Sequence, residues 1–273
     1  MSLSRVVACA VLCLCGWRSP AVADEHFRSG GVRINYRTHG AGEPVMLIHG
    51  WLSSGWVNWE LPGIARALAE NHQVVWFDLP AHGRSDAPAH IEAYGPELVE
   101  HVVRLMDHLK FDRAHIAGYS MGGIIAAKLA AIHPDRVLSM HLGGMGWLRE
   151  GSIEQRVFAA GGGDGKPVGL CFRSMASLAL TEKELLSISA PTRVLFGEED
   201  GLKALYLPPL RRARADWPVI EIPDANHLNC ILKPQFAADL KTWIDDHRQR
   251  DAAPEQPPGG VRNRAPAAET GAP

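Results

Sequence analysis

A serine between two glycines is the first feature of this sequence that could do chemistry. Ser120 lies in "GYSMGG" between Gly118 and Gly122, where a short apolar run is expected to end and an Ala-rich helical pattern to begin. A residue in such a sharp turn takes a strained backbone conformation, and its near neighbours must be small to avoid collision. The spacing favours a nucleophilic hydroxyl at the turn. A simple N-cap of the following helix is the alternative interpretation.

A serine hydroxyl is a poor nucleophile unless a base accepts its proton and an acid orients that base. His227, in "PDANHLNC", follows one predicted strand, and Asp200, in "VLFGEEDGL", follows another. Glu198 and Glu199 are adjacent carboxylates, and all three acids could instead form a solvated turn. The chain order serine, acid, histidine with a G-x-S-x-G turn is typical of one hydrolase architecture.

Short apolar runs alternate with helical patterns from about residue 32 onward. The predicted strands are GVRINYR, PVMLIHG, QVVWFDL, RAHIAGY, VLSMHLGG, TRVLFG and VIEIPD. Apolar residues recur at helical spacing in WELPGIARALAENH, YGPELVEHVVRLMDHLK, MGGIIAAKLAAIHP and PQFAADLKTWIDDHRQR. This alternation predicts an α/β fold with a mostly parallel central sheet and helices on both faces. Functional residues are then expected at the carboxyl ends of the strands.

The length of 273 residues, the net charge of −2 and the hydrophobic content of 46% fit one soluble domain without a bias towards nucleic acid. That domain is expected over residues 24–250. Two segments break the alternation of strands and helices. Residues 145–189 combine a Gly-rich stretch with a helix-like stretch, which is typical of a short cap inserted between two strands. Residues 251–273 are rich in Pro, Ala and Gly, so we predict a disordered tail there.

The N-terminal segment has the pattern of a secretory signal peptide. Arg5 precedes an apolar run, and Ala21 and Ala23 form an A-x-A cleavage site, so residues 1–23 should be removed before Asp24. A membrane anchor is the alternative, but the run is shorter than the ~20 residues that a spanning helix needs; a lipoprotein is a weaker one. We therefore expect a periplasmic or secreted protein without stable membrane insertion.

The mature chain would keep two cysteines, Cys171 and Cys230. A bridge between them and two separate buried thiols are both open at this point. The spacing of Cys and His residues does not resemble a metal site, and neither a metal nor another cofactor is expected.

The sequence resembles the α/β-hydrolase superfamily over roughly residues 31–248, a much longer stretch than the turn at Ser120 alone. "MLIHGW" is similar to the family's oxyanion loop, "DLPAHGRSD" to its D-x-x-G-x-G-x-S segment, "GYSMGG" to its nucleophile elbow, and "GEED" and "ANH" to its acid and histidine loops. Ala81 stands where relatives usually carry glycine, a change expected only to tighten a turn. The resemblance implies the α/β-hydrolase fold, with Ser120 as nucleophile, His227 as base and Asp200 as orienting acid.

The same resemblance assigns the oxyanion hole to the backbone N–H groups of Trp51 and Met121. His49 would shape the oxyanion loop. The candidates for the apolar wall of a substrate site are Trp51, Trp56, Trp59 and Trp147, although simple packing is an alternative role for each of them.

The signal-peptide pattern and the resemblance together lead us to expect an exported serine hydrolase that cleaves carboxylic esters of small to medium size through an acyl-enzyme. Hydrolysis of amides, thioesters or carbon–carbon bonds, and perhydrolysis, stay open, as does a catalytically silent ligand-binding homologue. Relatives that open epoxides or displace halide need aspartate at the elbow and are therefore poor models. The expected partner is a small-molecule acyl substrate; the oligomeric state is not predicted.

Overall fold

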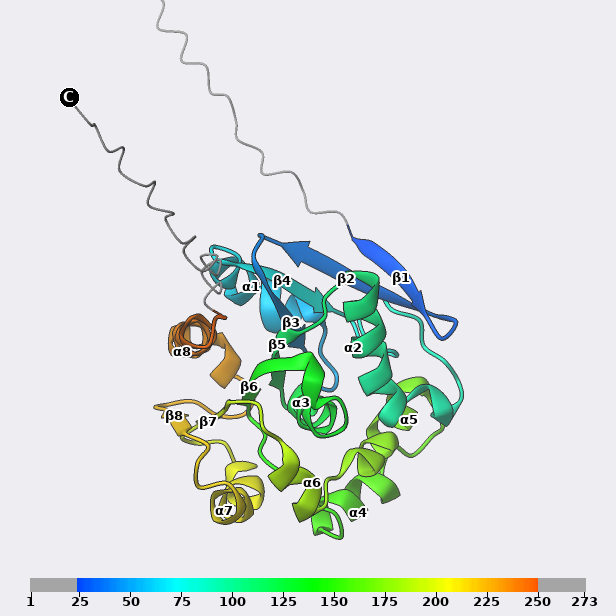
Figure 1. The fold of residues 1–273 in the computed structure, drawn as a ribbon. Coiled ribbons are helices and arrows are strands. Elements are labelled where there is room, and N and C mark those ends of the chain that lie inside the picture. The colour runs from blue at the N-terminus through cyan, green and yellow to red at the C-terminus, as the bar shows by residue number, and fades with distance from the viewer. Residues whose placement is uncertain (1–23, 250–273) are drawn as a thin grey trace, which may run out of the picture.

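The strands of this protein form one sheet at the centre of the molecule, as a computed structural model of residues 24–249 shows (Figure 1). The strands are β1 (Glu25–Ser29), β2 (Val32–His39), β3 (Glu43–Ile48), β4 (His72–Phe77), β5 (Ala114–Tyr119), β6 (Val137–Gly143), β7 (Thr192–Gly197) and β8 (Val219–Ile222). They lie in the order β1-β2-β4-β3-β5-β6-β7-β8. Strands β1 and β2 are antiparallel to their neighbours, whereas β4, β3, β5, β6, β7 and β8 run parallel. The predicted fold class is confirmed.

Helices cover both faces of the sheet because its central strands are apolar on both sides. The helices are α1 (Ile64–Leu68), α2 (Pro96–His108), α3 (Met121–Ile132), α4 (Ile153–Ala160), α5 (Pro167–Ser174), α6 (Glu182–Ser187), α7 (Lys203–Ala213) and α8 (Pro234–Asp246). Helices α2 and α3 bury one face of the sheet, and α1 and α8 bury the other. Short 3₁₀ or π turns are η1 (Trp56–Glu60), η2 (Ile91–Ala93), η3 (Pro134–Arg136), η4 (Met175–Leu178) and η5 (Cys230–Leu232).

Among the strands of residues 24–249, β1 is the one that the sequence patterns missed. Its residues alternate between exposed and buried, and Phe27 is its single large apolar residue that packs inward. Gly30 and Gly31, both at positive φ, close the hairpin to β2. An edge strand with so little apolar surface gives a weak sequence signal.

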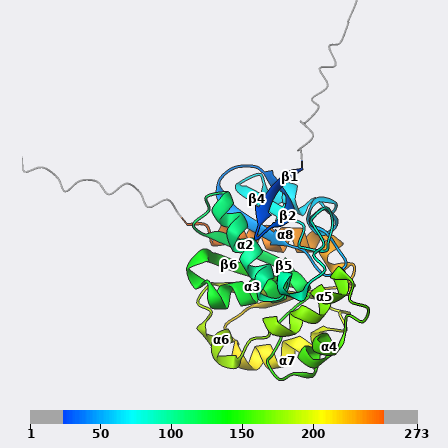
Figure 2. The ribbon, with the colours of Figure 1, turned by 90° about the vertical axis from the view of Figure 1, so that its right-hand side faces the viewer.

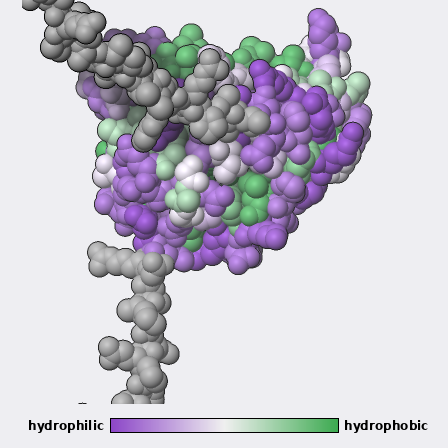
Figure 3. Space-filling model, turned by 90° about the horizontal axis from the view of Figure 1, so that it is seen from above, coloured by the Kyte–Doolittle hydropathy of each residue, from purple (hydrophilic) through white to green (hydrophobic). Residues whose placement is uncertain are grey.

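Residues 145–189 form the insertion between β6 and β7, and we call this segment the cap. It contains α4, α5, η4 and α6, and it packs on α3 through η4 and α6. Figures 1 and 2 show α4, α6 and α7 together at the end of the molecule away from β1 and β2. The opposite end, seen in Figure 3, is mostly hydrophilic with separate hydrophobic patches.

The predicted signal peptide (residues 1–23) and nearly all of the predicted tail (residues 251–273) lie outside the described residues. Between Asp24 and Gln249, no helix combines the length and the apolar character that a membrane crossing requires. Cys171 and Cys230 are two free, buried thiols. Burial raises the pKa of each to about 12, so both are uncharged at neutral pH.

Candidate active site

Ser120 occupies the turn between β5 and α3 in a strained conformation, with φ 54° and ψ −116°. Its N–H donates to the Gly143 carbonyl at 2.8 Å, which ties the turn to β6. A Cβ at Gly118 would collide with the Gly122 carbonyl, and a Cβ at Gly122 would collide with the Ile48 carbonyl. Both flanking glycines are therefore required by close backbone approach, as the sequence pattern predicted for a strained turn.

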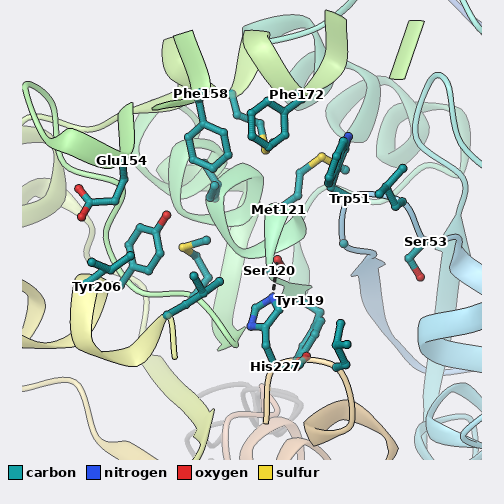
Figure 4. Close-up of a pocket in the computed structure, with 18 of the residues that line it drawn as sticks. Trp51, Ser53, Tyr119, Ser120, Met121, Glu154, Phe158, Phe172, Tyr206 and His227 are labelled. Atoms are coloured by element: carbon teal, nitrogen blue, oxygen red, sulfur yellow. Dashed lines mark hydrogen bonds between the residues drawn. The ribbon is translucent and has the colours of Figure 1, made fainter. Parts of the chain in front are cut away.

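The structure brings Ser120, His227 and Asp200 together. The His227 Nε2 atom is 3.0 Å from Ser120 Oγ (Figure 4). On the other side of the ring, Nδ1 is 2.7 Å from Asp200 Oδ2. The second Asp200 oxygen accepts a hydrogen bond of 2.9 Å from the Leu202 N–H, and the Asp200 side chain is fully buried. Since Asp200 accepts from Nδ1–H, Nε2 is left free to accept the serine proton.

The other two carboxylates of the "GEED" loop do not reach the histidine. Glu198 and Glu199 are exposed, and the hydrogen bonds of the His227 ring to described residues go to Asp200 and Ser120. Tyr119 fixes the opposite side of the histidine loop by donating from its hydroxyl to the His227 carbonyl at 2.6 Å.

The loop after β3 places Gly50 and Trp51 beside the serine. A Cβ built on Gly50 would lie 3.4 Å from Ser120 Cβ. The Gly50 N–H donates to Asn58 Oδ1 at 2.9 Å, and the Gly50 carbonyl accepts from His49 Nδ1–H at 2.7 Å. The Gly50 carbonyl and the Trp51 N–H belong to one planar peptide unit, so the bond from His49 also sets the direction of the Trp51 N–H.

Two buried histidines, both neutral, position this loop through hydrogen bonds to backbone N–H groups. His49 Nε2 accepts from the Leu79 N–H at 3.0 Å, and His82 Nε2 accepts from the Leu52 N–H at 3.2 Å. Burial lowers the pKa of His49 to about 3 and also lowers the pKa of His82. A neutral ring can accept at Nε2 while Nδ1–H donates, and protonation would remove the acceptor.

The "DLPAHGRSD" segment braces the oxyanion loop from the side. Asp78 accepts 2.9 Å hydrogen bonds from the N–H groups of Gly55 and Arg84 and from the Asn35 amide. Ala81 adopts a left-handed conformation, with φ 67°, so this alanine takes the conformation that glycine adopts more readily.

Neither proposed oxyanion donor is used elsewhere. Within residues 24–249, no hydrogen bond engages the N–H of Trp51 or of Met121. Met121 begins α3, where the positive end of the helix dipole adds to the two donors. The site can therefore supply two free N–H groups to a developing negative oxygen.

A cavity of about 690 Å³ opens onto the triad. Its lining is mostly apolar and comes from the oxyanion loop, α3, the cap, α7 and the histidine loop. The lining residues are Gly50, Trp51, Leu52, Ser53, Val57, Asn58, Tyr119, Ser120, Met121, Ile124, Met145, Ile153, Glu154, Val157, Phe158, Phe172, Met175, Leu202, Leu205, Tyr206, His227, Leu228 and Ile231. The cap and α7 residues were missed by sequence reasoning, because helical periodicity does not tell which helix face borders a cavity.

Of the four predicted tryptophans, Trp51 alone lines this cavity, and Trp59 is fully buried in the core instead. The Trp51 ring packs against Phe172, with 4.8 Å between the ring centroids. Trp56 is wrong as a wall residue of this cavity because 47% of its surface is exposed and it borders a separate cavity. Trp147 is also wrong as a wall residue: it is buried, and its indole N–H donates to the Leu180 carbonyl at 2.9 Å, which fixes the base of the cap.

The described part of the chain holds no group of three His, Cys, Asp or Glu side chains that could bind a metal ion. The chemistry available to the site is that of a histidine-activated serine next to two amide donors.

Comparisons with known proteins bear on the fold of the chain. The profile of the alpha/beta hydrolase fold family matches residues 43–157. The chain is 37% identical over 131 residues to 2-hydroxymuconate semialdehyde hydrolase of Pseudomonas sp. (strain CF600), an alignment that covers 46% of this chain and 44% of that protein. It is 35% identical over 107 residues to pimeloyl-[acyl-carrier protein] methyl ester esterase of Aeromonas hydrophila, which covers 39% of each chain.

The matched part thus spans less than half the length of these curated relatives. The structure of a thermophilic esterase from Thermogutta terrifontis superposes with a TM-score of 0.70 at 21% identity, over 83% of this chain and 100% of that one. At that identity the likeness shows the fold. Taken with the family profile, it shows that this chain has the α/β-hydrolase fold.

Proposed function

We propose that this protein is a serine hydrolase that cleaves carboxylic esters through an acyl-Ser120 intermediate. One observation carries the proposal: Ser120, His227 and Asp200 form a continuous hydrogen-bonded chain that opens onto a largely apolar cavity. Aspartate nucleophiles serve the epoxide-opening members of this fold, whereas a serine leads to an acyl-enzyme.

The proposed reaction uses each group in a defined role. His227 Nε2 accepts the Ser120 proton while the oxygen attacks the ester carbonyl, and the N–H groups of Trp51 and Met121 stabilise the resulting oxyanion. His227 then returns the proton to the leaving alcohol. A water molecule, deprotonated by the same nitrogen, releases the acid and restores the serine. Asp200 stabilises the imidazolium at both steps without becoming protonated itself.

The cavity supports a small to medium substrate with an apolar portion. Its 690 Å³ lies within the range of ~300–1,000 Å³ that is usual for small-molecule sites. Neither Lys nor Arg lines it within the described residues, so it offers no counter-ion to an anionic substrate.

Hydrolysis of a carbon–carbon bond is the second candidate, because one relative is named a semialdehyde hydrolase. The same serine, histidine and oxyanion donors would serve it. A panel of esters of varied acyl length, run beside an amide and a diketone, separates the candidates by their kcat/KM values. A higher kcat/KM for the amide or the diketone than for every ester would contradict the ester proposal.

The deciding experiment is labelling by a fluorophosphonate, which reacts with an activated serine. Wild-type protein should be labelled, and Ser120→Ala or His227→Ala should abolish labelling. Either substitution should also reduce ester turnover to the residual rate that oxyanion stabilisation alone supports. A folded wild-type protein that neither reacts nor cleaves any short ester would favour the ligand-binding alternative.

We also propose that the enzyme is exported and that its mature chain begins at Asp24, a proposal supported by the A-x-A pattern at Ala21 and Ala23. The intact mass of the protein recovered from the periplasm or the medium tests it. A membrane-associated species that retains Met1 would contradict it.

A further inference from the structure

The cavity next to Ser120 carries one carboxylate. Glu154, in the first turn of α4, is the single acidic residue among those that line the cavity, and no Lys or Arg lines it within residues 24–249. Glu154 has no ion pair or hydrogen bond to any other described side chain. No described cationic side chain therefore pairs with its charge, and the cavity around it is mostly apolar.

A second polar group on the same side also lacks a partner. The Tyr206 side chain, on α7, is 4% exposed and lines the cavity, and its hydroxyl makes no hydrogen bond within the described residues. Figure 4 shows Tyr206 beside Glu154 on one side of Ser120, with Trp51 on the other side. Burial and the nearby Glu154 charge raise the pKa of Tyr206 to about 12, so its hydroxyl stays protonated at neutral pH.

Helix stability alone does not account for the position of Glu154. A carboxylate in the first turn interacts favourably with the helix N-terminus wherever it points, and Glu182 in α6 occupies the same kind of position without lining the cavity. A neutral substrate that filled the cavity would remove water from Glu154 and leave the charge unpaired, which is costly. A substrate with a positive charge would instead compensate it.

We propose that Glu154 and Tyr206 form a subsite for an ammonium group of the substrate. The subsite rests on the proposed ester hydrolysis at Ser120, and it adds the substrate class: esters with a cationic amine or quaternary ammonium in the acyl or the alcohol part. The carboxylate supplies the counter-charge, the phenol oxygen and ring supply a polar and aromatic wall, and Phe158 and Leu205 supply apolar contacts for methyl groups.

Matched ester pairs test the charge preference. Choline butyrate is compared with the butyrate ester of its tert-butyl analogue, which has the same shape without the charge. A second pair places the trimethylammonium or tert-butyl group at the end of the acyl chain of a nitrophenyl ester. The subsite predicts at least a tenfold preference in kcat/KM for the cationic member of one pair in wild-type protein.

Variants then assign the preference to the subsite. Glu154→Gln should reduce the cationic-to-neutral ratio about tenfold, whereas the matched control Glu182→Gln, also in the first turn of a cap helix, should leave the ratio as in wild type. Tetraethylammonium should inhibit hydrolysis of the neutral ester competitively, and its binding measured by calorimetry should weaken at least tenfold in Glu154→Gln.

The outcomes separate the two proposals. Cleavage of the neutral esters without any cationic preference, or a preference that survives Glu154→Gln, overturns the subsite and leaves ester hydrolysis standing. Failure to cleave any of the four esters, with tetraethylammonium binding that depends on Glu154, overturns ester hydrolysis and supports the subsite. Absence of tetraethylammonium binding to wild-type protein counts against the subsite in either case.

Discussion

Asp200 differs from its two acidic neighbours in burial and in its partner. Its side chain is fully buried, one oxygen lies 2.7 Å from His227 Nδ1, and the other accepts from the Leu202 N–H, whereas Glu198 and Glu199 are exposed. The local backbone thus orients one carboxylate of three towards the histidine.

Replacing Asp200 by asparagine should lower kcat by up to about four orders of magnitude, because an amide that donates to Nδ1 favours the wrong imidazole tautomer. Glu199→Gln is the matched control and should retain nearly wild-type turnover. Ester hydrolysis rates with circular dichroism spectra of both variants measure this. A larger loss for Glu199→Gln than for Asp200→Asn would show that the acid is assigned wrongly.

At the scale of elements, the loop after β3 depends on His49. His49 Nδ1–H holds the Gly50 carbonyl, and that peptide unit carries the proposed Trp51 donor. His49→Ala should lower kcat about ten- to a hundredfold with a small change in KM, since loss of an oxyanion donor affects the transition state.

His101→Ala provides the comparison for that experiment, because His101 is also buried but contacts Ser29 of β1 and does not line the cavity. Both variants should lose stability, and the folded His101→Ala protein should keep its kcat. Equal loss of kcat in the two variants would contradict the positioning role of His49.

Two glycines of the cap are needed for close packing. Gly162 and Gly169 lie backbone against backbone, and a Cβ on Gly162 would collide with the Gly169 carbonyl. Gly165 has a similar positive φ, 70° against 79° for Gly162, but a Cβ there would meet no atom within 4 Å.

Gly162→Ala should therefore destabilise the protein by about 1–3 kcal/mol more than Gly165→Ala, since both variants share the cost of a left-handed alanine and one adds the clash. Urea unfolding of the two variants measures the difference. If the two unfolding free energies are equal, the cap has relaxed around the added methyl group.

The whole molecule should lose stability in mild acid because several buried histidines are neutral. Burial lowers the pKa of His49 to about 3 and that of His101 to about 4, and it also lowers the pKa of His82, His115 and His141. Below about pH 6.5 the unfolded chain binds protons at these positions and the folded chain does not. Unfolding therefore becomes more favourable as the pH falls.

Each histidine that stays neutral in the folded chain lowers the free energy of unfolding by up to about 1.4 kcal/mol for each pH unit below 6.5, until the pH reaches its folded-state pKa. Thermal unfolding at pH 7, 6 and 5 should show a steadily falling Tm, and His101→Ala should show a shallower slope than wild type. A Tm that is constant between pH 7 and pH 5 would contradict this account.

The sequence by itself determined the parallel sheet, the glycine-flanked turn at Ser120 and the order of serine, acid and histidine. These follow from local rules: apolar runs between turn residues form strands, and a strained turn accepts only small neighbours. Strand β1 escaped these rules because an edge strand needs few apolar residues.

Only the tertiary structure decided which side chains meet. It directed Trp56 to the surface and Trp147 into packing, and it brought Glu154 of the cap beside Tyr206 of α7. Periodicity tells which face of an element is apolar, but the partner of that face depends on how distant segments pack. The triad could be read from chain order, whereas the cavity wall belongs to long-range packing, for which a single sequence has no local signal.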